Sequence, residues 1–230
     1  LGGTGDNWER APYFLDGILP LAYYLKDKKL WEIAQKYIDC ILDSQDEEGN
    51  FGPQDTKDDW WSRMVALKVL VQYYEITKEE RVLDFMHRYY HFQQKKLPEN
   101  PLTEWGKARC ADLLYCIKWL YERQPQVYLL ELANVIVKQG DKWNELFERF
   151  PFVYPTEYYY DWGIMENYTR NELLKLMRFH HTHIVNVTMA LKYPAMTTWL
   201  KENNDEKVLE EAMKTLNKYH GVATGMINGD

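Results

Sequence analysis

Apolar residues recur at three- and four-residue spacing along most of the chain, which is the pattern of amphipathic helices. One run covers 15–25, and a second covers 34–42 and ends before a polar, glycine-containing turn at 46–53. In a third run, over 61–71, apolar residues lie on nearly every side of the predicted helix. Such a helix is buried over most of its surface.

The predicted helices come in pairs that repeat. The buried run is followed by a one-sided apolar stripe over 82–90, which ends before Pro98. Residues 21–45 overlay residues 70–94 with matching apolar positions, an offset of about 49 residues that is typical of helical-hairpin repeats. The two segments therefore predict an inner and an outer helix in each repeat.

Two further pairs follow the same plan. A helix over 104–120 precedes a partner over 125–136, and a helix over 171–191 is separated by a break at 192–194 from one over 205–219. No segment of any length alternates with the period of a strand. The sequence therefore predicts a single all-α domain of helical-hairpin repeats over 1–230. Such hairpins stack as an open solenoid or a closed toroid, and periodicity alone leaves both open.

Composition and charge limit the classes of molecule that we expect this chain to bind. The chain has 230 residues, of which 46% are apolar, and a net charge of -7. No basic stripe is present, so we expect neither nucleic acid nor a membrane surface as a partner. No apolar run approaches the roughly 20 residues of a membrane span. The cellular compartment stays open.

The cysteines give no sign of a metal or redox site. Cys40, Cys110 and Cys116 are an odd number, lie in apolar helical stretches and lack the Cys-x-x-Cys spacing. We expect all three in the core.

Aromatic residues lie beside acids where several inner helices begin, and this suggests a sugar site. Aromatics make up 15% of the chain, with nine Trp and eighteen Tyr. Sugar rings pack on aromatic faces while carboxylates accept protons from hydroxyls. In a toroid, equivalent ends of the inner helices converge on one face. The segments are Trp8, Glu9 and Arg10; Asp59, Trp60 and Trp61; and Glu104 and Trp105.

Each of these segments also has a structural interpretation. Asp58 and Asp59 can cap a helix, and capping is favoured for Asp58. Glu9 and Glu104 can form surface ion pairs. Neighbouring residues on a helix point in different directions, so at most one of Trp60 and Trp61 is expected to face a cleft. Carboxylates available for glycoside hydrolysis are Glu9, Asp16, Asp58, Asp59, Glu104 and Asp230.

The histidine cluster at His180, His181 and His183 has two interpretations beyond a packed core or surface histidine. His180 and His183 would share one helical face, as a metal pair requires, but spacing supplies no third ligand, and we predict no metal site. One imidazole could instead hydrogen-bond a sugar hydroxyl or a leaving group.

Three stretches, Gly3–Gly17, His183–Pro194 and Tyr219–Asp230, resemble the β-L-arabinofuranosidase-like glycoside hydrolases. The helical layout is similar over almost the whole chain. The resemblance implies that the hairpins form part of an (α/α)6 toroid. It also implies a fragment of a glycoside hydrolase acting on terminal L-arabinofuranosyl or related sugars of plant-type oligosaccharides or polysaccharides.

The resemblance implies that catalysis belongs to residues beyond Asp230. In the family a glutamate is the acid/base and a zinc-bound cysteine is the nucleophile, with a Glu-x-Cys motif and a Cys-Cys pair. None of the three cysteines of this chain matches them. We therefore expect no cofactor within the chain, zinc in a full-length protein, and no catalytic residue that can be named.

Substrate contacts carry over from the resemblance to particular residues. His183 matches a histidine near the sugar, and Asp58–Trp61 and Glu104–Arg109 match inner-helix starts that reach the site; Asp230 ends the third stretch. The family often has histidine in the motifs that match Asp58–Trp61 and Glu104–Arg109. This chain has no histidine in either, so the resemblance does not determine which sugar it binds. The expected binding residues are Trp8, Glu9, Arg10, Asp59, Trp60, Trp61, Glu104, Trp105, Arg109, His183 and Asp230.

Two other functions stay open at this point. One is a metal-free toroid glycosidase or unsaturated-uronide hydrolase that uses carboxylates such as Glu9 and Asp59. The other is a helical-repeat scaffold that binds protein along its concave face and has no enzymatic activity.

Overall fold

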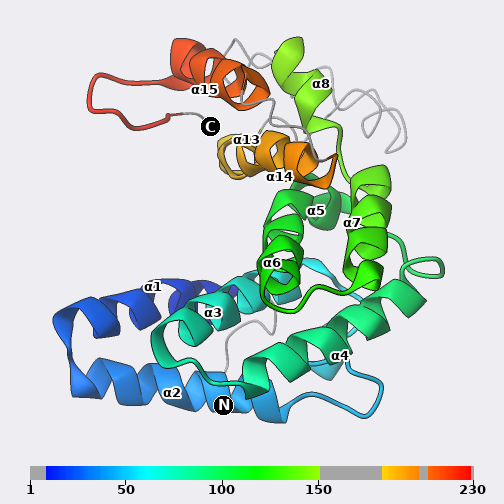
Figure 1. Ribbon diagram of the computed structural model, residues 1–230. Helices are drawn as coiled ribbons and strands as arrows, with labels where there is room; N and C mark the ends of the chain where they lie inside the picture. Colours follow the sequence, from blue (N-terminus) through cyan, green and yellow to red (C-terminus); the bar gives the residue numbers. More distant parts are fainter. Residues whose placement is uncertain (1–8, 151–182, 202–206, 229–230) are drawn as a thin grey trace, which may run out of the picture. The chain divides into compact units, whose positions relative to one another are not determined.

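The computed structural model describes residues 9–150, 183–201 and 207–228 (Figure 1). Within these ranges the regular elements are helices and no strand occurs; one isolated antiparallel bridge pairs Gly221 with Ile227. The all-α prediction is confirmed.

The chain divides into two compact units. The first contains residues 1–106 and 112–139, and the second contains 107–111 and 140–230. The expectation of a single domain over 1–230 stays a prediction, and each unit is described by itself.

The first hairpin of unit 1 consists of α1 (Arg10–Leu25) and α2 (Lys28–Asp43). Lys26 ends α1 in the left-handed conformation, with φ of 53°. Asp27 then caps α2, because its carboxylate accepts from two backbone amides of the first turn. The turn is therefore only two residues long, and it lays α2 back along α1 (Figure 1).

The second hairpin consists of α3 (Trp61–Thr77) and α4 (Arg81–Lys96). Residues 61–67 and 69–71 of α3 are all buried, which confirms the interpretation of this run as an inner helix. Helix α3 packs against both α1 and α4. Helix α4 buries one face and exposes the other, as expected of an outer helix.

The third hairpin departs from the prediction at its start. The single helix expected over 104–120 is divided at Arg109 into α5 (Glu104–Ala108) and α6 (Cys110–Arg123), followed by α7 (Val127–Gln139). The short α5 carries Glu104 and Trp105, so these residues belong to a separate turn of helix. Helix α7 packs on α4 within unit 1.

Unit 2 contains α8 (Trp143–Glu148), α13 (Ile184–Met189), α14 (Lys192–Leu200) and α15 (Lys207–His220). The break predicted at 192–194 lies instead at 190–191, between α13 and α14, and residues 192–194 form the first turn of α14. Pro194 is tolerated there, since the first amides of a helix have no intrahelical acceptor. The helix predicted over 205–219 corresponds to α15.

The cysteines lie partly as expected. Cys110 and Cys116 are buried, but Cys40 is exposed on α2. Its position follows from the apolar stripe of α2, where Ala34 and Ile38 face the core and Cys40 lies off that face. The expectation of three core cysteines is therefore wrong for Cys40.

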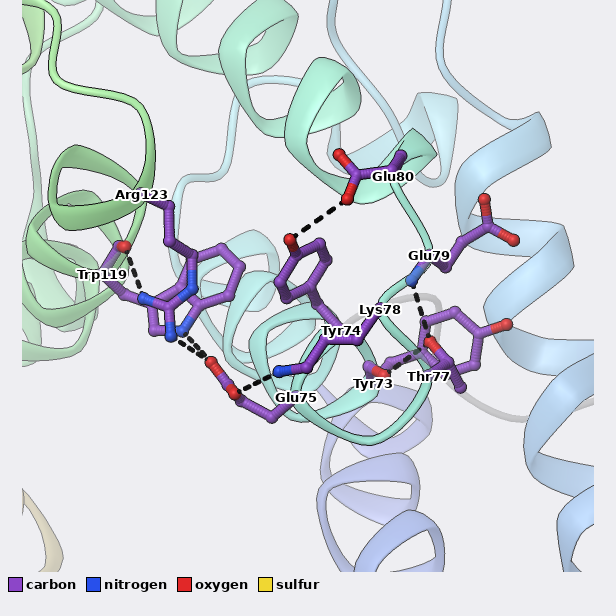
Figure 2. Close-up of polar contacts among 9 residues, drawn as sticks. All are labelled: Tyr73, Tyr74, Glu75, Thr77, Lys78, Glu79, Glu80, Trp119 and Arg123. Carbon is purple, nitrogen blue, oxygen red and sulfur yellow. Dashed lines mark hydrogen bonds and ion pairs between the residues drawn. The ribbon is translucent and has the colours of Figure 1, made fainter.

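A polar cluster fastens the C-terminal end of α3 to α6 (Figure 2). The carboxylate of Glu75 accepts from Trp119 Nε1 at 2.8 Å, from Lys78 Nζ at 2.9 Å and from Arg123. The Arg123 guanidinium also lies over the Trp119 ring, 4.1 Å from its centroid. We call Glu75, Lys78, Trp119 and Arg123 the Glu75 clamp.

Candidate functional site

A depression of about 460 Å³ lies in unit 1 at the N-terminal ends of α3 and α5. It brings together three residues that were expected to bind substrate, Asp59, Glu104 and Trp105, although they come from two different repeats. We call this depression the acidic pocket. Its lining residues are Asp55, Thr56, Asp58, Asp59, Thr103, Glu104 and Trp105.

One wall of the acidic pocket is the segment that leads into α3. It contains the 3-10 turn Gln54–Thr56 and the acids Asp58 and Asp59. Neither Asp58 nor Asp59 is the N-cap of α3, because that position belongs to Trp60, which makes no side-chain capping bond. Asp59 Oδ1 instead accepts from the backbone amide of Trp61, the first residue of the helix, at 3.0 Å, so Asp59 both supports the helix start and lines the pocket.

The other wall is the start of α5. Glu104 has a φ of 38°, a left-handed conformation that is strained for a residue with a Cβ. The surrounding turn stabilises this backbone conformation of Glu104, because the amide of Gly106 donates to the carbonyl of Thr103 at 2.8 Å. The side chain of Glu104 is exposed and that of Trp105 half-buried at the pocket.

Asn100 and Trp60 join the two walls. The Trp60 indole donates to the carbonyl of Asn100 at 2.9 Å, and the Asn100 amide donates to the carbonyl of Asp58 at 2.8 Å. This pair of bonds crosses about 40 residues of sequence and fixes the spacing of the walls.

Beneath the first wall lies Arg63, which the sequence analysis did not single out. Its side chain is 2% exposed and donates to the carbonyls of Thr56 and Asp59 at 2.6 and 2.8 Å and to Asn50 Oδ1 at 3.1 Å. Burial lowers the pKa of Arg63, and nearby groups that include Asp59 oppose the shift. A charged residue inside an otherwise apolar run was the available signal for a buried anchor.

The lining of the acidic pocket is rich in hydrogen-bond acceptors. Four of the seven lining residues are carboxylic acids, two are threonines and one is a tryptophan, and no basic residue is among them. Ionised carboxylates only accept hydrogen bonds. The pocket therefore suits a ligand that carries hydroxyl or ammonium donors and an apolar face for the indole.

Trp60 and Trp61 do not line the pocket. Their exposed fractions are 3% and 0%, so neither offers an open ring face to a sugar, contrary to the expectation that one of them would. The Trp61 indole donates to Glu9 Oε2 at 2.5 Å, and its ring packs 6.1 Å from that of Tyr13. Glu9 is thus bonded to the core, while Arg10 is exposed at the first position of α1.

Arg109 and His183 both belong to unit 2. Arg109 is 5% exposed and donates through Nε to Asn186 Oδ1 at 2.6 Å, a buried contact, so its contact with a substrate stays a prediction. His183 is half-buried, and its backbone carbonyl accepts from the first turn of α13. Its imidazole role stays a prediction. Trp8, His180, His181 and Asp230 lie outside the described residues.

Within the described ranges, no group of three or more His, Cys, Asp or Glu residues is placed to hold a metal ion. None of the described helices combines the length and the apolar character needed to cross a membrane. The chain was also compared with family models, curated proteins and solved structures, and none of them matches it.

Proposed function

We propose that this chain is the sugar-binding part of a glycoside hydrolase domain and that the acidic pocket is one of its sugar subsites. The observation that supports it most is the convergence of Asp59, Glu104 and Trp105 on one depression of about 460 Å³. This volume lies in the range of small-molecule sites, and the residues offer acceptors beside an aromatic ring. The closed (α/α)6 toroid is part of the same proposal.

The charge of the pocket favours a neutral sugar over an acidic one. A uronide would bring its own carboxylate against Asp55, Asp58, Asp59 and Glu104, with no lining cation to offset the repulsion. This argues against the unsaturated-uronide hydrolase. The choice of L-arabinofuranosyl among neutral sugars rests on the resemblance of Gly3–Gly17, His183–Pro194 and Tyr219–Asp230 to the arabinofuranosidase-like hydrolases.

The proposal for this chain is limited to binding. Among the described residues, Cys110 and Cys116 are buried and Cys40 is exposed, and no group of three or more His, Cys, Asp or Glu residues is placed to hold a metal ion. Bond cleavage is assigned to residues outside the chain. Loss of hydrolysis in a full-length Asp59→Asn variant, with no effect of a chelator, would instead favour the metal-free mechanism.

Titration with methyl β-L-arabinofuranoside, followed by NMR of the indole and amide signals, tests the sugar subsite. Trp105→Ala and Glu104→Gln are expected to weaken binding at least about tenfold, because each removes a ring face or an acceptor from the pocket. Glu99→Gln is the matched control, since Glu99 is exposed nearby but does not line the pocket. Equal affinity in all three variants contradicts the proposal.

A second candidate is the non-enzymatic helical-repeat scaffold. Helix α1 exposes several apolar side chains, among them Leu21 at 49%, Tyr24 at 81% and Leu25 at 63%. Exposed apolar surface of this kind is typical of protein contacts. A flat response to a panel of plant glycans, together with capture of a protein partner that Leu21→Asp abolishes, would favour this function.

A further inference from the structure

We infer that Arg63, which does not line the acidic pocket, is its positioning residue. The inference rests on the proposed function for the meaning of the pocket. The role of Arg63 itself is argued from its contacts and can be tested without a sugar.

The positioning role follows from what the guanidinium binds. It donates to the carbonyls of Thr56 and Asp59 at 2.6 and 2.8 Å, with a longer contact to the carbonyl of Pro53 at 3.5 Å. These carbonyls lie along the wall that carries Asp55, Asp58 and Asp59. A planar guanidinium reaches several acceptors in fixed directions, so one side chain sets the path of the whole segment.

The guanidinium is itself oriented by Asn50. Asn50 Oδ1 accepts from Arg63 Nε at 3.1 Å and from the amide of Phe51 at 2.9 Å, and its amide nitrogen donates to the carbonyl of Lys57 at 3.3 Å. The Arg63 guanidinium carbon lies 5.9 Å from the centroid of the Phe51 ring. Asn50 is 7% exposed, so this support is also in the interior. A lysine at position 63 would keep the positive charge but would lose the planar set of donors that reaches several acceptors at once.

The test measures amide hydrogen exchange in residues 53–59 by NMR or mass spectrometry. Arg63→Met is expected to speed exchange in this segment at least about tenfold, and Arg63→Lys to speed it less. Glu75→Gln, at the other end of α3, is the matched control and is expected to leave the segment unchanged. Unchanged exchange in Arg63→Met, or an equal increase in Glu75→Gln, overturns the positioning role.

These outcomes are separate from the sugar titration. A chain that shows no binding of methyl β-L-arabinofuranoside, but shows the expected changes in amide exchange, contradicts the proposed function and leaves the role of Arg63 standing. A chain that binds the sugar equally well with and without Arg63, with unchanged exchange, contradicts the inference alone.

Discussion

The two ends of α3 are fastened to their neighbours by opposite arrangements of charge. At the N-terminal end, the buried cation Arg63 is held by neutral carbonyls and an amide oxygen. At the C-terminal end, the anion Glu75 is held by the indole of Trp119 and by the cations Lys78 and Arg123. Only the first arrangement leaves the neighbouring acids directed at a pocket.

Burial explains what each arrangement can do. Arg63 is 2% exposed, whereas the side chain of Glu75 is 42% exposed. A buried charged group that loses its partners is costly, while an exposed ion pair is screened by water and salt. We therefore expect the Arg63 end to govern stability and the shape of the pocket, and the Glu75 clamp to make a smaller, salt-sensitive contribution.

The largest expected effect is that of Arg63→Met on stability. Methionine removes the charge and leaves the carbonyls of Thr56 and Asp59 and the oxygen of Asn50 without their donor. The free energy of unfolding is expected to fall by about 3 kcal/mol, measured by urea denaturation. A loss smaller than that of any substitution in the Glu75 clamp would reverse the comparison.

Trp119→Phe is expected to have an intermediate effect. Phenylalanine keeps a ring that packs edge-on against Tyr74, but it lacks the Nε1 donor to Glu75 and offers a smaller face to Arg123. The free energy of unfolding is expected to fall by about 1 kcal/mol. Trp31→Phe is the control, since Trp31 stacks on Tyr73 without a part in the clamp. An equal loss in both variants would mean that only ring size matters.

The smallest effect concerns the pH dependence of the Glu75 clamp. The hydrogen bond from Lys78 holds the pKa of Glu75 below its ordinary value of 4.5, aided by Trp119 and by the charge of Arg123. A lowered folded-state pKa adds stability above pH 4.5, and this is lost as the pH falls through the folded-state value. The free energy of unfolding of the wild type is therefore expected to exceed that of Glu75→Gln by about 0.5 kcal/mol at pH 7, after allowance for solvent screening.

The same pair of proteins gives the control for this prediction. The difference between wild type and Glu75→Gln is expected to vanish on acidification below pH 4.5 and to shrink in about 1 M salt, where exposed charges are screened. The loss caused by Arg63→Met is expected to persist in salt. If the difference in free energy of unfolding between wild type and Glu75→Gln is independent of both pH and salt, the clamp stabilises the protein through packing and not through charge.

The helical plan was predictable from local pattern, with errors where local rules compete. The run over 61–71 predicts a helix buried all round, and α3 is such a helix. Pro194 suggested a break because proline lacks an amide donor, yet the first turn of α14 does not need that donor. Cys40 was expected in the core because it lies in an apolar helical stretch, yet the apolar stripe of α2 leaves it outside.

The acidic pocket was predictable only in part. Asp59, Glu104 and Trp105 were chosen because acids and tryptophans at inner-helix starts suit a sugar, and the structure places all three at one depression. The same rule selected Trp60 and Trp61, and the family resemblance selected Arg109, and all three are buried. Burial depends on what packs against a side chain from elsewhere in the chain, and a local pattern contains no record of that.

The sequence by itself determined that this protein is helical and where most of its helices lie, because a period of 3.6 residues fixes the buried face of each helix. Only the tertiary structure decided which acids reach the pocket and what holds them. The indole of Trp60 donates to the carbonyl of Asn100, 40 residues later. The guanidinium of Arg63 is oriented by its hydrogen bond to Asn50, 13 residues earlier. Such contacts form only when separate elements come together, so the residue that organises the pocket is absent from its lining.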